Sequence, residues 1–178
     1  MRERTYQLAL GGILGAAALA FMAIGSLIPF GTFAVPALAS LSVLIINEEL
    51  NWKVALMSYM TISVLSLVII PDKEAAALFI GFIGYYPILK KVIESRVRKK
   101  WLLLVIKLAA FNAAVLATYY VMLHLLVLPA VREEFADYTF WLLLLILALG
   151  NLAFYFFDIV ISRVGIIYRE HWRKRFVK

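Results

Sequence analysis

The stretch KKVIESRVRKK, from Lys90 to Lys100, decides how this chain is folded, because it places six cationic residues and one acid within an otherwise apolar sequence. A run of charges of this density is not stable in the hydrocarbon of a bilayer, and Lys and Arg accumulate in the cytoplasmic loops of membrane proteins. The stretch therefore predicts a cytosolic loop, and the apolar segments on either side are counted outward from it.

The composition predicts an integral membrane protein. The 178 residues are 65% hydrophobic and their mean hydropathy is +0.93, which exceeds what a soluble core of this length can bury. The net charge of +7 does not indicate a nucleic-acid partner, because most cations flank apolar runs, where they fix topology and contact membrane lipid headgroups. The chain has no cysteine, so disulfides, thiolate metal sites and cysteine nucleophiles are excluded.

The apolar runs predict an all-α, polytopic membrane protein with six transmembrane helices in a single domain, residues 1–178. The uncharged run over residues 5–47 is about twice the roughly 20 residues of one crossing, so we expect it to turn back near Pro29, Gly31 and Pro36. We interpret its first part as a retained helix and not as a cleaved signal peptide. The predicted helices cover residues 6–28, 33–47, 52–70, 75–89, 101–128 and 139–162, followed by a basic cytosolic tail over residues 163–178.

The distribution of cations predicts that both termini are cytosolic. Six crossings place 15 Lys and Arg on the side of the central cluster and only Lys73 and Arg132 on the other. The remaining cation, Lys107, lies within the fifth predicted helix. For the basic tail, an amphipathic helix on the inner leaflet and a frayed topogenic end are both open.

Lys107 and Asp158 are the two ionisable residues that require an explanation inside a span, because each costs about 2.5 to 3.5 kcal/mol at the bilayer centre. They lie about 9 Å and about 8 Å deep, on helices that we expect to be antiparallel neighbours. These matching depths predict an ion pair. The pair is interpreted either as a packing device or as part of transport, and snorkelling of Lys107 without a partner is a further alternative.

Two further layers of polar residues lie on the same two predicted helices. Asn112 and Asn151 come next, and their amides are expected to bond each other or a ligand. Toward the outer end lie side chains that form either an interfacial aromatic belt or a pocket for a flat organic ligand, roofed by the turn from Pro29 to Pro36. The residues of this outer group are Tyr119, Tyr120, His124, Tyr138 and Trp141.

Gly12, Ala16 and Ala20 recur every four residues on the first predicted helix and form a smooth face for close helix contact, either within the protein or with another subunit. No catalytic motif is recognised: the chain has no H-E-x-x-H pair, G-x-S-x-G elbow or nucleotide-binding loop. We therefore expect no enzyme activity, no cofactor and no metal site.

The architecture resembles that of the S components of energy-coupling factor transporters, small bacterial membrane subunits that capture vitamins or metal ions. The resemblance rests on six helices, cytosolic ends and the small residues from Ala16 to Ala20, which match the form of that family's docking stripe. It implies a bacterial plasma membrane protein that binds a vitamin-like nutrient and works with a transmembrane coupling subunit and ATPases. It also implies that the turn from Pro29 to Pro36 closes the pocket. The N-terminal metal-binding histidine of the nickel and cobalt members is absent.

A different class of function is also open. Small six-helix proteins with many cytosolic cations serve as non-enzymatic scaffolds of cell-envelope machinery, similar in style to the rod-shape protein MreD. A pull-down separates the two classes, because co-purified ATPases favour transport and co-purified envelope synthases favour the scaffold.

Overall fold

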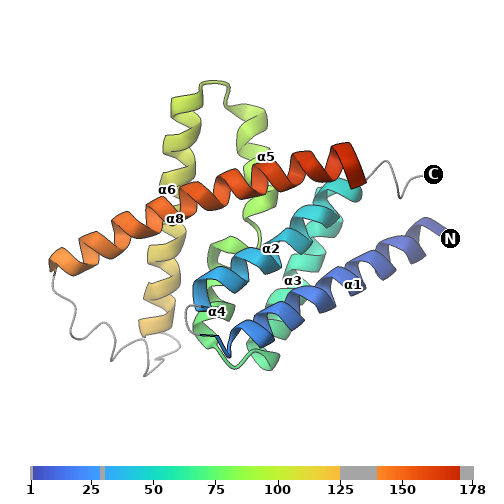
Figure 1. The fold of residues 1–178 in the computed structure, drawn as a ribbon, viewed down its shortest axis with the longest axis horizontal. Coiled ribbons are helices and arrows are strands. Elements are labelled where there is room, and N and C mark those ends of the chain that lie inside the picture. Colours follow the sequence, from blue (N-terminus) through green and yellow to red (C-terminus); the bar gives the residue numbers. More distant parts are fainter. Residues whose placement is uncertain (1, 29–30, 125–139, 173–178) are drawn as a thin grey trace.

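The computed structural model describes residues 2–28, 31–124 and 140–172, and it forms helices and no strand over these ranges (Figure 1). Six segments in the described ranges are long and apolar enough to cross a membrane, which indicates a multi-pass membrane protein. The elements are α1 (Arg2–Gly25), α2 (Gly31–Glu49), α3 (Trp52–Ile69), α4 (Lys73–Leu78), the π-helix η1 (Phe79–Ile83), α5 (Tyr86–Arg96), α6 (Lys100–His124), α8 (Phe140–Ile167) and the π-helix η2 (Tyr168–Trp172).

Helix α2 is the central element of the first half of the chain, because it packs against α1, α3, α4, α5 and α8. Its apolar residues Ala39, Val43 and Ile46 are fully buried and belong to one hydrophobic cluster with Met22 of α1 and Ile62 of α3. This burial gives α2, with only 19 residues, a central place among the helices that it contacts.

The connections around α2 are fixed by side-chain caps. The side chain of Asn51 accepts bonds from the first amides of α3, and the side chain of Asp72 does the same for α4. The second carboxylate oxygen of Asp72 also accepts a 2.7 Å bond from the Thr32 hydroxyl, which joins the start of α2 to the start of α4.

The turn predicted near Pro29, Gly31 and Pro36 does not extend to Pro36, and the second helix, predicted over residues 33–47, begins earlier than expected. Helix α2 begins at Gly31, so Pro36 lies inside it. A proline within a helix removes one hydrogen bond, and burial of Pro36 among neighbouring helices offsets that loss here.

Two predicted helix ends are also shifted. The fourth segment continues beyond residue 89 to Arg96, and α8 continues beyond residue 162 to Ile167. The first residue of the charged stretch, Lys90, is consequently helical and only 5% exposed, although the whole stretch was expected to be a loop. Both helices continue past their predicted ends because the charged side chains at these points either have partners within the protein or lie at the surface.

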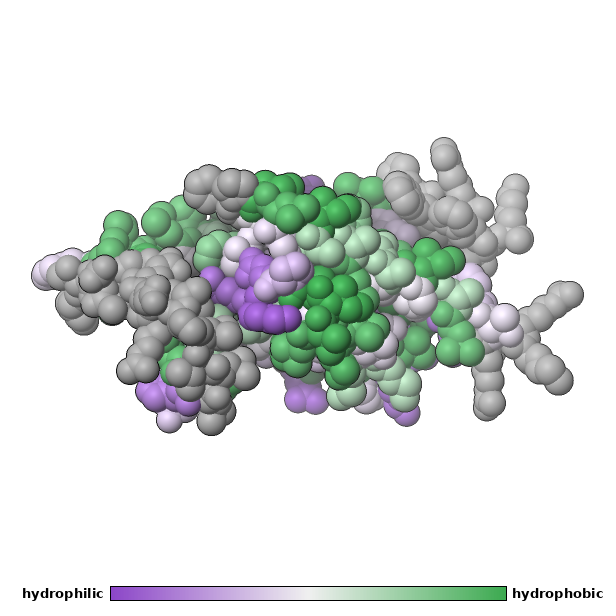
Figure 2. Space-filling model, turned by 90° about the horizontal axis from the view of Figure 1, so that it is seen from below, coloured by the Kyte–Doolittle hydropathy of each residue, from purple (hydrophilic) through white to green (hydrophobic). Residues whose placement is uncertain are grey.

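Helix α8 crosses α5 and α6 and does not run antiparallel alongside α6 as the sequence analysis expects (Figure 1). Most of its residues from Trp141 to Leu149 are exposed. The surface seen from below Figure 1 carries a compact hydrophilic patch beside a broad hydrophobic area, and further hydrophilic residues lie along its edges (Figure 2). Exposed apolar side chains along a helix of this length are expected where lipid replaces water as the solvent.

Candidate functional site

The candidate site begins with an irregular segment of the fourth span, where a π-helix separates α4 from α5. The hydroxyl of Tyr59 donates a 2.6 Å bond to the carbonyl of Ile80, and the hydroxyl of Tyr85 donates a 3.0 Å bond to the carbonyl of Gly81. These side chains satisfy main-chain oxygens inside the span, where water is scarce. π-Turns of this kind are frequent at functional positions, and this one sets the direction in which α5 presents its side chains.

A cluster of aromatic rings connects α5 with α6 and α8. The rings of Phe111 and Phe154 are stacked with centroids 4.5 Å apart, and Phe82 and Tyr86 meet Phe154 at 5.5 Å and 5.0 Å. Phe82, Tyr86 and Phe154 are nearly or fully buried. This apolar layer encloses one side of the polar network described next, which lowers the local dielectric and strengthens the interactions in that network.

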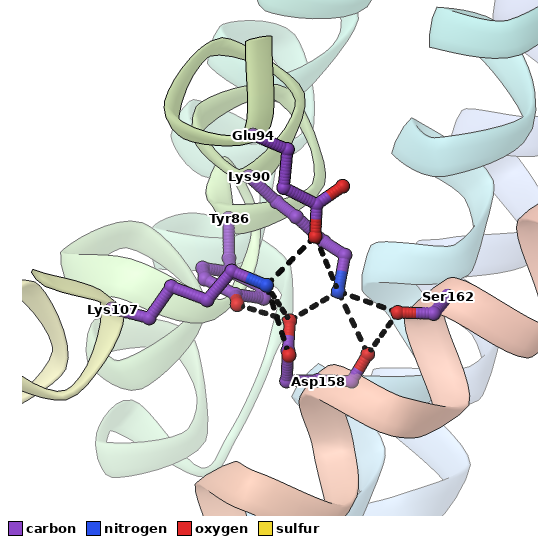
Figure 3. Close-up of polar contacts among 6 residues, drawn as sticks. All are labelled: Tyr86, Lys90, Glu94, Lys107, Asp158 and Ser162. Carbon is purple, nitrogen blue, oxygen red and sulfur yellow. Dashed lines mark hydrogen bonds and ion pairs between the residues drawn. The ribbon is translucent and has the colours of Figure 1, made fainter. Parts of the chain in front are cut away.

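Asp158 of α8 is the centre of a network of hydrogen bonds and ion pairs that we call the Asp158 network (Figure 3). Its carboxylate accepts a 2.5 Å bond from the Tyr86 hydroxyl, two 3.0 Å bonds from the Lys107 ammonium, and a bond from the Lys90 ammonium. Lys90 also donates a 2.9 Å bond to the main-chain carbonyl of Asp158 and a 2.7 Å bond to Ser162. One carboxylate of α8 is therefore bonded to both α5 and α6.

Glu94 completes the Asp158 network. It accepts a 2.7 Å bond from Lys107 and lies 3.4 Å from Lys90, so that two lysines face two carboxylates. Lys90 and Lys107 are 5% and 3% exposed, whereas the Glu94 side chain is partly open. A buried set with equal numbers of opposite charges, each with hydrogen bonds, is far less costly in a membrane than any member alone. Chemically, the Asp158 network can fix the relative positions of three helices, or its charges can stabilise a bound proton or cation.

The structure brings together Lys107 and Asp158, the two residues predicted to pair from their depths. It adds Tyr86, Lys90, Glu94 and Ser162, none of which stands out as a site residue in the sequence. The available pattern was a spacing of four residues, because Tyr86, Lys90 and Glu94 lie on one face of α5. The dense positive charge from Lys90 onward concealed that pattern.

The amides of Asn112 and Asn151 form a second polar layer between α6 and α8. Each amide nitrogen donates to the oxygen of the other, at 2.8 Å and 3.0 Å, and each also donates to the carbonyl four residues earlier on its own helix. The sequence predicts that these amides bond either each other or a ligand, and the structure shows the bonds between the two amides.

The outer group of predicted binding residues does not converge on one point in the described part of the chain. Tyr119 donates a 2.7 Å bond to Glu74 of α4, a contact that the sequence analysis missed. Tyr120 and His124 stack on each other with centroids 4.5 Å apart at an exposed position, and Trp141 is 76% exposed. Tyr138 lies outside the described residues. A ligand pocket at this end stays a prediction.

The small-residue face of α1 is exposed. Gly12, Ala16 and Ala20 point away from the core, whereas Ala18 and Met22 on the other side of the helix are fully buried. An added Cβ at Gly12 would meet nothing within 4 Å. This face therefore has space for the close approach of another helix.

A third set of contacts joins the ends of α2, α5 and η2. The Glu48 carboxylate forms ion pairs with Lys91 at 3.4 Å and with Arg169 at 3.1 Å. The Tyr168 hydroxyl donates a 2.8 Å bond to Glu49. These contacts place residues from the basic tail against the end of α2, which accounts for the continuation of α8 into η2.

Comparison with known proteins does not assign the chain to a family. No family model matches it, and neither a curated protein nor a solved structure does.

Proposed function

We propose that this chain is the small-molecule-binding subunit of an energy-coupling factor type of transporter in the bacterial plasma membrane, with both termini in the cytosol. In this role it binds a vitamin-like nutrient near the outer ends of α6 and α8 and depends on a transmembrane coupling subunit and ATPases for energy. The chain itself performs no catalysis.

The exposed small-residue face of α1 is the observation that carries the proposal. Gly12, Ala16 and Ala20 lie opposite the buried side of the helix, and nothing in the described residues covers them. Small residues allow helix backbones to approach closely, which is how helices associate where lipid tails remove the hydrophobic driving force. A second membrane subunit fits such a face better than lipid alone does.

The proposal is tested by purifying the tagged chain from its native membrane. A coupling subunit and ATPases are expected to co-purify with the wild-type chain, and Ala16→Leu and Ala20→Leu are expected to release them. Ile13→Leu is the matched control, because it changes an exposed side chain of α1 without adding bulk. Native mass spectrometry of the gently extracted chain is expected to show a retained small molecule.

A second candidate is a non-enzymatic scaffold of a cell-envelope complex. The Asp158 network favours it, since two lysines and two carboxylates satisfy one another and leave little for a transported ligand. In that case envelope synthases, and not ATPases, co-purify with the chain and no small molecule is retained.

A further inference from the structure

A groove of about 490 Å³ lies at the end of the molecule where cations gather, between the end of α2, the start of α3 and the last turns of α5. It is at the opposite end of these helices from the outer aromatic group. Leu50, Trp52, Ile88 and Val92 give it an apolar wall, and its polar lining residues are Asn47, Glu48, Asn51, Lys91 and Ser95. Its size is typical of sites that hold small organic molecules or headgroups.

Asn47 has a buried amide that lacks a partner. The residue is 4% exposed, and its amide nitrogen bonds no other group among the described residues. A buried donor left without an acceptor is destabilising, so such groups are rare unless something else binds them. Asn47 is one of the residues that line the groove, so a turn of its side chain would present the amide to an oxygen acceptor of a ligand bound there.

The charge on the rim of the groove selects the ligand class. Lys91 lies 3.4 Å from Glu48, but its side chain is 56% exposed and an ammonium has three donors. Glu48 lines the groove together with Lys91 and is also bonded to Arg169 beside the groove, so two cations share this one carboxylate. This local excess of one cation over the carboxylate favours an anionic group as the ligand.

The apolar wall of the groove favours a lipid over a free anion as the ligand. Trp52 is exposed beside the groove, at the level where tryptophan marks the boundary between headgroups and hydrocarbon. Ile88 and Val92 continue from that level along α5 into the span. A free phosphate would use the rim and leave this wall unoccupied, whereas a phospholipid covers both.

We propose that this groove binds an anionic phospholipid, with its phosphate and ester oxygens on Lys91 and the Asn47 amide and its first methylenes over Leu50, Ile88 and Val92. Basic sites between helices on the cytosolic side are a known means of lipid recognition. The inference is independent of the transport proposal, because it concerns the opposite end of the molecule from the predicted nutrient site.

Native mass spectrometry of the full chain in detergent tests the inference, with phosphatidylglycerol and phosphatidylcholine of the same acyl chains as probes. Phosphatidylglycerol is expected to bind more tightly than phosphatidylcholine. Lys91→Gln is expected to weaken the binding of phosphatidylglycerol about tenfold, because it removes one charge-assisted hydrogen bond. Asn47→Leu is expected to weaken it as well without lowering thermal stability, because it removes an unsatisfied amide. Arg98→Gln is the matched control, since it removes an exposed cation of the neighbouring connection that does not line the groove.

Three results would overturn the inference. The first is equal binding of the two lipids, and the second is an equal loss in Arg98→Gln and Lys91→Gln, which would mean that only general charge matters. The third is displacement of phosphatidylglycerol by inorganic phosphate at millimolar concentration, which would make the site one for a free anion.

Discussion

Lys90 is bonded to both the carboxylate and the main-chain carbonyl of Asp158, so a single side chain of α5 holds α8 at two points. The residue that begins the most cationic stretch of the sequence is thus buried in the protein. Because Asp158 also bonds Tyr86 and Lys107, it is the member on which the other contacts depend.

Asp158→Leu is expected to destabilise the protein more than any other single change in the network. It leaves two buried lysines with one partly exposed carboxylate, and breaking a buried ion pair costs about 3 to 5 kcal/mol. Lys107→Met is expected to cost less, because Asp158 keeps its bonds from Lys90 and Tyr86. Thermal unfolding in detergent measures the order, and Lys99→Met, at an exposed position, is the control.

The double variant Lys107→Met with Asp158→Leu is expected to recover part of the loss caused by Asp158→Leu alone. Removing one lysine together with one carboxylate restores equal numbers of positive and negative charges, and it leaves Lys90 3.4 Å from Glu94. Contacting residues couple by about 0.5 to 3 kcal/mol in such a cycle. Strictly additive losses in the free energy of unfolding would show that the two residues act separately.

The helical class and the Lys107 and Asp158 contact follow from the sequence because span length and depth can be counted along a helix. The role of Lys90 does not, since a run of cations looks the same whether its first member is solvated or paired with an acid from another span. The crossing of α8 over α6 is equally hidden. Helix α8 is largely apolar, and its few polar residues, Asn151, Asp158 and Ser162, indicate partners on neighbouring helices without fixing the angle at which the helices cross.

The error at Pro36 has a different cause. Pro29, Gly31 and Pro36 all favour a turn locally, but the buried contacts of α2 decide which of them ends a helix. Conversely, the mutual bonds of Asn112 and Asn151 could be predicted from the sequence, because two amides at similar depth in apolar surroundings have few other partners.

Gly81→Ala is expected to destabilise the protein, because the added methyl would overlap the Thr118 hydroxyl of α6. Overpacking of this kind costs about 1 to 3 kcal/mol. Gly12→Ala is the matched control, since its methyl has open space and its helical propensity improves. Thr118→Ala added to Gly81→Ala is expected to restore part of the thermal stability, and equal losses in the two glycine variants would contradict the close contact.

The proposed orientation is tested with single cysteines in this cysteine-free chain. Cysteine at Arg96 is expected to resist an impermeant thiol reagent in intact cells, and cysteine at Lys73 is expected to react. The reason is the imbalance of 15 cations to 2 across the two sides. Both positions are exposed, so each cysteine is accessible from its own side and reacts once the membrane is permeabilised. Labelling at position 96 in intact cells would reverse the orientation.

His124→Ala and Trp141→Ala are expected to abolish retention of the small molecule while thermal stability stays nearly unchanged. Both residues are exposed, so truncating them removes little packing, whereas an aromatic or heterocyclic ligand would lose a stacking surface and a hydrogen-bonding imidazole. Trp101→Ala is the matched control, because Trp101 is a similarly exposed tryptophan at the opposite end of α6. Native mass spectrometry reads out the ligand and thermal unfolding reads out stability. If both outer variants retain the ligand as Trp101→Ala does, the outer aromatics form only an interfacial belt, and the scaffold becomes the better account of the protein.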